Sequence, residues 1–435
     1  MSNLYIQVKY SVFGFLFFTF ITWHFFAFSL APIIDLNNVD DIGFISYQYY
    51  ILNGKPGFLT ALHIFSYTLF SLISSCFILN RKINYDLCFR IEKLMPNPED
   101  FLKVFIIIGV LSNIIYFYNF GFKNALMLAS SMRAKHYDGD TSFLFLKSIS
   151  YVSLYAVCFI PYICKSNLRN KNALIFFYVS LVLMAYLNSV SRTIVLTYLI
   201  IPILMIGMMS VKAISFKKVL VLFFTMLIGT LVLFYGKSFG NVMSSFIDGR
   251  DAAFVSQDLY FIDVLLKLVS EQSYLWYSVD AGMNNFFHHG FYFPIDVFLS
   301  VFGFIPSSVL NSLGLGFLNF DSVDVTLSCY NSMAFSLNDC TVPTRFIGYT
   351  SYFFPIGGGV LYGVLVGSVM SSLNKLWKLC QENNLKTTWA PYLLWLIFSA
   401  FLTFVPNTIS RACFVVFIML LVYFLFNFLN RLSSR

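Results

Sequence analysis

Charged residues are scarce in this chain: Asp, Glu, Lys and Arg make up 11% of its 435 residues, against 58% hydrophobic residues. Soluble domains carry about 25% charged residues, so the composition argues against a soluble protein. Acidic residues are nearly absent from the long apolar runs, which argues against a proton-coupled pump. The net charge of +8 is scattered over many loops and tails, so it predicts no nucleic-acid partner.

Motifs of soluble-cofactor and metal chemistry are also missing. The sequence contains no Walker motif, no G-x-S-x-G and no H-E-x-x-H, and no G-x-G-x-x-G lies in a strand–helix context. The 8 cysteines form no C-x-x-C pair and no Cys/His cluster. We therefore expect neither a metal nor a cofactor. A disulfide between Cys329 and Cys340 is chemically feasible if both lie outside the cytoplasm.

What the sequence does contain is a series of apolar blocks of about 17–23 residues, long enough to cross a bilayer as helices. They predict an all-α polytopic membrane protein with about ten transmembrane helices, forming a single integral membrane domain over residues 1–435. The predicted spans are 11–31, 58–80, 104–121, 148–165, 173–190, 193–211, 219–236, 349–371, 388–405 and 412–430.

The first span has two interpretations. Lys9, the apolar run after it and the Ser-Leu-Ala sequence at 29–31 resemble a cleavable signal peptide. Pro32 follows directly, and proline after a cleavage site disfavours cleavage. We therefore interpret this segment as a retained membrane anchor.

The short loops rich in Lys and Arg all fall on one side of the predicted bundle. The positive-inside rule assigns that side, and with it both termini, to the cytoplasm. The opposite side is then the periplasm of a bacterium, and the lipid bilayer is the inner membrane. We expect the active face to be periplasmic.

A large periplasmic loop, 237–345, is predicted between the seventh and eighth spans. At roughly a hundred residues it is too long for a connector, so we expect folded structure in it. Apolar residues at helical spacing over 259–269 predict an amphipathic helix. Residues 291–310 are apolar but broken by prolines, which predicts an interfacial or re-entrant segment. Trp276, Tyr277 and Tyr292 are either interfacial aromatics or residues that stack on sugar rings.

Single arginines on the external side break the usual charge bias, so each needs an anionic partner or a packing role. They are Arg192, Arg250, Arg345 and Arg411. Residues 188–192 (N-S-V-S-R) match residues 407–411 (N-T-I-S-R), and both are expected in a tight external turn that opens a span. Turn chemistry alone also explains these residue types.

Other external charges have competing explanations. Arg250 lies between acidic neighbours and so has a local salt bridge as its alternative role, whereas Arg133 gives the 122–147 loop a basic cluster. An external imidazole or carboxylate suits a general base, and the candidates are His288, His289 and Glu271. Asp251 and Asp296 are further candidates that the spacing does not exclude.

Small and polar residues inside the predicted spans favour packing. Gly359, Gly363 and Gly367 are four residues apart, a stripe that allows close helix contact. His24 and His63 lie within spans, where a helix-to-helix hydrogen bond is the expected role.

Three features together resemble the bacterial O-antigen polymerases, the oligosaccharide repeat-unit polymerases. The first is Ser191-Arg192 at the external start of a span, and the second is the Phe-Ile-Pro sequence at 304–306 in the large loop. The third is the segment 345–363, which runs from Arg-Phe-Ile-Gly-Tyr through Gly-Gly-Gly into the next span. The resemblance covers most of the chain as architecture.

The resemblance implies a glycosyltransferase of lipopolysaccharide biosynthesis. Its donor and acceptor would be glycans on undecaprenyl diphosphate, and a chain-length regulator protein would be a further partner. Arginine binds phosphate oxygens bidentately, so arginines would stabilise the diphosphate leaving group without a metal. A lipid-linked oligosaccharide flippase and the O-antigen ligase are the alternatives, and the large folded loop argues against the flippase.

Overall fold

A computed structural model of the chain describes residues 57–80, 97–121, 144–166, 168–189, 192–203, 276–288, 299, 301–303, 305, 307–318, 345–383, 385–403 and 405–433. Over these residues the secondary structure is helical, with no strand. The predicted spans 11–31 and 219–236 lie outside the described residues, as do His24, Tyr292, Cys329 and Cys340.

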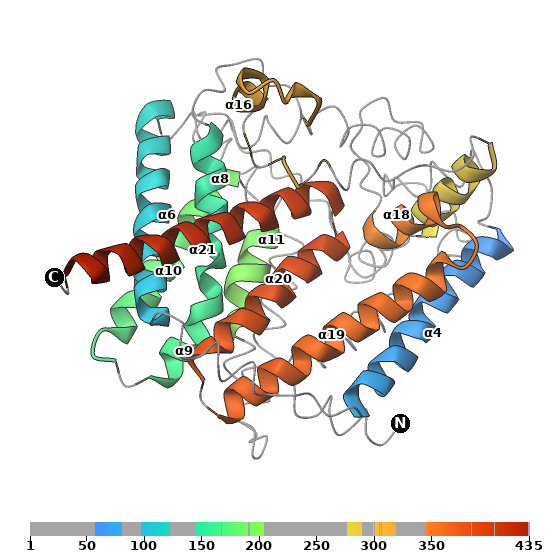
Figure 1. Ribbon diagram of the computed structural model, residues 1–435, viewed down its shortest axis with the longest axis horizontal. Helices are drawn as coiled ribbons and strands as arrows, with labels where there is room; N and C mark the ends of the chain where they lie inside the picture. Colours follow the sequence, from blue (N-terminus) through green and yellow to red (C-terminus); the bar gives the residue numbers. More distant parts are fainter. Residues whose placement is uncertain are drawn as a thin grey trace, which may run out of the picture. The chain divides into compact units, whose positions relative to one another are not determined.

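The helices follow one another along the chain as drawn in Figure 1. Their bounds are α4 Phe58–Asn80, α6 Pro98–Phe120, α8 Leu144–Ser153, η2 Leu154–Phe159, α9 Ile160–Lys165, α10 Lys171–Ser189, α11 Arg192–Val195, η3 Leu196–Ile200, α16 Ser307–Ser312, η4 Gly316–Leu318, α18 Arg345–Phe353, α19 Gly358–Glu382, η5 Lys386–Thr388, α20 Trp389–Thr403 and α21 Val405–Ser433. A further helix, unlabelled in Figure 1, covers residues 276–288.

Within the described residues, 5 helical segments are long and apolar enough to cross a membrane. They are Phe58–Ile78, Pro98–Phe120, Leu146–Lys165, Lys171–Asn188 and Gly358–Cys380. These segments coincide with, or overlap, spans predicted from the sequence. The protein is therefore an all-helical, multi-pass membrane protein in its described part, while the total of about ten spans stays a prediction.

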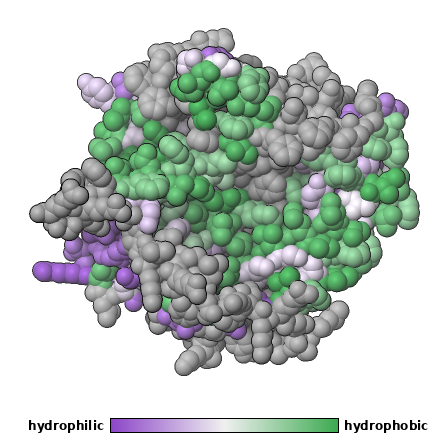
Figure 2. Space-filling view, in the orientation of Figure 1, coloured by the Kyte–Doolittle hydropathy of each residue, from purple (hydrophilic) through white to green (hydrophobic). Residues whose placement is uncertain are grey.

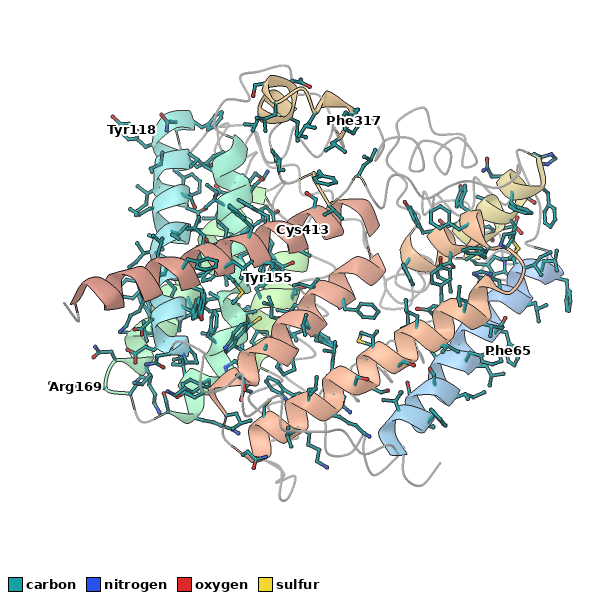
Figure 3. The ribbon with its side chains drawn as sticks, in the orientation of Figure 1. Phe65, Tyr118, Tyr155, Arg169, Phe317 and Cys413 are labelled. Atoms are coloured by element: carbon teal, nitrogen blue, oxygen red, sulfur yellow. The ribbon has the colours of Figure 1, made fainter. Side chains whose placement is uncertain are left out.

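The surfaces of these helices agree with a lipid environment. Phe65 of α4 is 50% exposed and Tyr118 of α6 is 84% exposed, and both point away from their helices in Figure 3. The described surface in Figure 2 is largely apolar. An apolar surface of this extent is unfavourable in water and favourable against the hydrocarbon core of a bilayer.

One predicted span differs from the structure. The apolar run was expected to form a helix over 349–371 directly after Arg345, but α18 ends at Phe353 and α19 begins at Gly358. Pro355 has no backbone N–H, and Gly357 adopts a φ of 80°, which side-chain-bearing residues rarely do. The chain therefore breaks between the two helices, and the membrane-crossing segment starts only at Gly358.

The chain is organised in two units, each assembled from segments that are distant in sequence. Unit 1 consists of 1–84, 259–379 and 394–418, and unit 2 of 85–258, 380–393 and 419–435. In unit 2, Phe101 of α6 stacks on Phe159 with ring centroids 5.6 Å apart, and Trp389 lies 5.6 Å from the Phe159 ring. These aromatic rings form part of the packing between α6, η2 and the start of α20.

In unit 1, α4 and α19 lie side by side at close range (Figure 1). A Cβ atom at Gly359 would collide with the carbonyl of His63, and one at Gly363 would lie 2.6 Å from the carbonyl of Tyr67. A Cβ at Gly367 would meet Ser71 and Ser74 in the same way. The small-residue stripe is thereby confirmed as a packing stripe.

The register of this contact also gives its direction. Gly359, Gly363 and Gly367 meet successive turns of α4 in ascending order, so the two helices run parallel. Further along, the Lys375 Nζ atom donates a hydrogen bond of 2.6 Å to the Ile78 carbonyl near the end of α4. Parallel packing is what the Lys/Arg pattern predicts, because both spans were expected to begin on the external side.

Adding one methyl group at the centre of this contact tests it. We expect Gly363→Ala to destabilise the protein by about 1–3 kcal/mol, because the new Cβ meets backbone that cannot move aside. Gly57→Ala is the matched control, since nothing lies within 4 Å of its added Cβ. Thermal unfolding of the detergent-purified variants measures the difference, and equal melting temperatures would contradict the packing described here.

Candidate functional site

Polar groups gather in unit 1 where three helices meet: the first half of α4, helix 276–288 and α18. We call this cluster the polar junction, and its members are Gly57, Thr60, His63, Asp280, Asn284 and Thr350. The side chains of Thr60, His63, Asp280 and Thr350 are buried, whereas Gly57 and Asn284 are exposed. Asp280 is 7% exposed and His63 is 3% exposed. A carboxylate and an imidazole at such depth require hydrogen-bond partners.

Asp280 joins helix 276–288 to the N-terminus of α4. Its Oδ1 atom accepts a hydrogen bond of 3.0 Å from the Gly57 backbone N–H and one of 2.6 Å from the Thr60 hydroxyl. Its Oδ2 atom accepts from the Asn284 amide, one turn along its own helix, at 3.2 Å. The first turn of a helix presents unpaired N–H groups and partial positive charge, so a carboxylate there is electrostatically favoured.

His63 joins α4 to α18. The His63 Nε2 and Thr350 Oγ1 atoms share a hydrogen bond of 3.0 Å, whose direction is set by the imidazole tautomer, and the Thr350 hydroxyl also lies 2.7 Å from the Ile347 carbonyl. The other ring nitrogen, Nδ1, lies 3.4 Å from the Pro355 carbonyl at the break before α19. The helix-to-helix hydrogen bond expected for His63 is confirmed.

Small residues let these elements approach one another. A Cβ at Gly348 of α18 would lie 3.0 Å from the Cβ of Ser278, and one at Gly282 would collide with Ser351. A Cβ at Gly358 would lie 3.2 Å from the His63 ring. Helix 276–288 is therefore packed closely against α18 as well as hydrogen-bonded to α4.

The predicted catalytic residues are only partly described. His288 is an exposed residue at the end of helix 276–288. His289 and Glu271 lie outside the described residues, and so do Asp251 and Asp296. Among the predicted diphosphate ligands, Arg133 and Arg250 also lie outside them.

The remaining arginines occupy different local structures. Arg192 is the first residue of α11 and Arg345 is the first residue of α18, which belongs to the polar junction. Arg411 lies inside α21, which already begins at Val405. The expectation that residues 407–411 form a tight turn is therefore wrong, since they lie in the first two turns of α21. Pro406 explains the earlier start, because proline is tolerated in the first turn of a helix.

In the motif copy at 188–192, the first residue, Asn188, has a packing role. Asn188, near the end of α10, donates its side-chain amide to the Asn113 Oδ1 atom of α6. The Asn113 amide in turn donates to the Ser150 hydroxyl of α8 at 2.8 Å. Asn188 and Asn113 together link three helices of unit 2, and the likeness between the two motif copies does not extend to their local structure.

Two aromatic residues assigned by the sequence to the predicted large loop are buried and so are not available to a ligand. Trp276 and Tyr277 are 9% and 0% exposed in helix 276–288. The suggestion that they stack on sugar rings is wrong for these two residues, because neither ring face is open. Residues 276–283 are all buried, so this part of the helix is enclosed by its neighbours on every side.

Sequence reasoning missed Asp280, Thr60 and Thr350. Asp280 lies in a run of small and apolar residues, and its partners on α4 are more than two hundred residues away in the sequence. The one local signal is the Asp280–Asn284 pair at helical spacing. Thr and Ser residues inside apolar helices are common, so Thr60 and Thr350 gave no distinct signal.

In the polar junction, the Asp280 carboxylate is held by hydrogen-bond donors from Gly57, Thr60 and Asn284. In the described part of the chain, no group of three or more His, Cys, Asp or Glu residues is placed to hold a metal ion.

Comparison of the chain with protein-family models, with curated proteins and with solved structures gave no match.

The His63–Thr350 bond can be tested without changing side-chain size. We expect Thr350→Val to leave the buried His63 Nε2 atom without its hydrogen-bond partner and to lower the stability by about 1–3 kcal/mol. Thr350→Ser keeps the hydroxyl and should unfold close to the parent temperature. Thermal unfolding in detergent compares them, and a valine variant as stable as the serine variant would show that the bond contributes nothing.

Proposed function

We propose that this protein is an O-antigen polymerase of the bacterial inner membrane. It joins undecaprenyl-diphosphate-linked repeat units into a polymer at the periplasmic face. The proposal rests on the sequence resemblance together with the helical, multi-pass architecture. The observation that carries it is the polar junction, in which a helix of the predicted periplasmic loop is hydrogen-bonded to the beginning of α4, and α4 is hydrogen-bonded to α18.

A fixed loop suits glycosyl transfer better than a passive connector does. The donor and the acceptor are both attached to lipid, so their reacting groups meet near the external rim of the membrane. An enzyme must hold the two in one geometry, and this orientation supplies a large part of the rate enhancement. Helix 276–288 and α18, packed on one another and on α4, provide such a rigid support.

The reaction breaks the bond between the anomeric carbon of the donor glycan and its diphosphate oxygen. That carbon forms a new bond to an acceptor hydroxyl, whose proton passes to a base. Arg345, at the start of α18, is the proposed ligand of the departing diphosphate, with Arg192, Arg250, Arg411 and Arg133 as further candidates. His288 is the described candidate for the base, beside His289 and Glu271.

Deleting the protein distinguishes a polymerase from a flippase. We expect a strain that lacks it to make lipopolysaccharide capped with a single repeat unit, because single units can still be exported and ligated. Lipopolysaccharide gel profiles measure this directly. Total loss of O-antigen, with lipid-linked repeats retained inside the cell, would favour the flippase. Polymer of normal length would contradict both.

Replacing the external arginines tests the leaving-group role. We expect Arg345→Ala to reduce polymerisation about ten- to hundredfold at normal membrane abundance, because a charged hydrogen bond contributes about 1.5–3 kcal/mol. Arg345→Lys should restore activity only in part, since an ammonium cannot make the bidentate contact. The same pair of substitutions applies at 192, 250 and 411.

Arg169→Ala is the matched control for this series. Arg169 lies in the turn between α9 and α10 (Figure 3), on the predicted cytoplasmic side, and should tolerate alanine. O-antigen length and protein abundance are measured for every variant. If all four external alanine variants polymerise normally at normal abundance, these arginines do not form the site.

A further inference from the structure

Asp280 connects two parts of the chain that are far apart in sequence. Its Oδ1 atom contacts Gly57 and Thr60 at the beginning of α4, whereas its Oδ2 atom contacts Asn284 on its own helix. The two oxygens thus face different elements. The carboxylate thereby fixes both the position and the rotation of helix 276–288 relative to α4.

Packing alone does not require an acid at this position. Replacing buried ionic groups by apolar residues of similar volume is often neutral or stabilising, so a buried carboxylate is weak evidence for a stability role. Its best-attested use is to specify one register among several. Here the register is set against backbone and side-chain donors in the first turn of α4, at hydrogen-bond lengths of 3.0 and 2.6 Å.

Helix 276–288 also fixes the position of α18, because the two helices are in close contact. Ser278 lies against Gly348, and Gly282 lies against Ser351, with no room for added side chains at the two glycines. α18 is in turn hydrogen-bonded to α4 through Thr350 and His63. The contacts form a closed ring of three helices, so a shift of helix 276–288 would displace α18 as well.

The two described candidates for the chemistry, His288 and Arg345, lie on helices of this ring. His288 lies eight residues after Asp280 on the same helix, about 12 Å along its axis. Arg345 lies three residues before Gly348, at the start of α18. Neither residue is a member of the polar junction, yet the backbone of each is carried by an element that Asp280 places.

We propose that Asp280 is a positioning residue, whose carboxylate locks helix 276–288 to the N-terminus of α4 and so sets the geometry of His288 and Arg345 for glycosyl transfer. This proposal rests on the proposed polymerase function. Asp280 acts through the elements it holds, and it takes no proton from the acceptor and makes no contact with the diphosphate.

The first test separates position from stability. Asp280→Asn and Thr60→Val should each reduce polymer formation about ten- to hundredfold per unit of membrane protein, the factor for loss of a charged hydrogen bond. Thr60→Ser is the matched control, because it retains the hydroxyl, and it should polymerise normally. O-antigen length and membrane abundance are measured together.

The second test reads the position of the helix directly, without using activity. A cysteine introduced as Ser278→Cys would lie at a fully buried position against Gly348. In a background with Cys329, Cys340 and Cys413 replaced by serine, a membrane-impermeant maleimide should label it slowly. Adding Asp280→Asn should raise the labelling rate at least severalfold, whereas adding Thr60→Ser should not.

The third test exchanges the two partners. Thr60→Asp combined with Asp280→Thr again pairs a carboxylate with a hydroxyl, and it keeps the acid in the first turn of α4, where it is favoured. We expect this double variant to recover both slow labelling and polymer formation. Recovery of slow labelling without polymer would mean that the carboxylate acts chemically at position 280, which overturns the positioning role.

An unchanged labelling rate in Asp280→Asn would overturn the proposal as well, whatever its polymer length. These outcomes are separate from a failure of the polymerase assignment. That assignment fails when a strain lacking the protein still makes polymer, and the labelling results would then still report whether Asp280 holds helix 276–288 in place.

Discussion

Backbone contact between α4 and α19 is the constraint on which the described part of unit 1 depends. Helices in a bilayer gain little from burying apolar surface against each other, so close van der Waals packing and hydrogen bonds must hold them. The glycines of α19 allow this approach, and the Ser74 and Ser75 hydroxyls donate to the Gly363 and Gly367 carbonyls at 3.4 and 3.3 Å. Because the pair is parallel, the N-termini of both helices lie at the same end.

The polar junction is a consequence of that arrangement. Two helix beginnings and the break after α18 place unpaired backbone groups at one end of the helix pair, and such groups must be satisfied within the protein. The Asp280 carboxylate accepts from the Gly57 N–H, and the His63 ring faces the carbonyls and hydroxyl at the end of α18. Helix 276–288, which the sequence assigns to the predicted periplasmic loop, thus satisfies hydrogen-bond donors at the start of α4, and these hydrogen bonds fix it to that helix.

The sequence predicted the features that depend on local composition. Apolar length located α4, α6 and α10, glycine spacing predicted the packing face of α19, and the loop charges predicted that α4 and α19 would run in the same direction. Features set by distant contacts were missed. The partners of Asp280 come from the other end of the chain, and the break at 354–357 is concealed in a continuous apolar run, where only Pro355 and Gly357 mark it.

The matching motifs at 188–192 and 407–411 show why residue identity alone did not determine the site. One copy crosses from the end of α10 to the start of α11, while the other lies within the first turns of α21. Position in the helix matters because the N-terminal end carries partial positive charge. An arginine there is mildly unfavourable for the helix itself, whereas an arginine further along is not.

This electrostatic difference distinguishes Arg345 from Arg411 as a site for an anion. Arg345 opens the nine-residue helix α18, where its charge adds to the positive end of the dipole, a cost of about 0.3–1 kcal/mol that an acidic residue would avoid. A bound anion such as a diphosphate would remove the cost and use both the side chain and the helix end. Arg411 lies beyond the first turn of α21 and gains no such advantage. Under the proposed function, position in the helix therefore favours Arg345 over Arg411 as a ligand of the diphosphate.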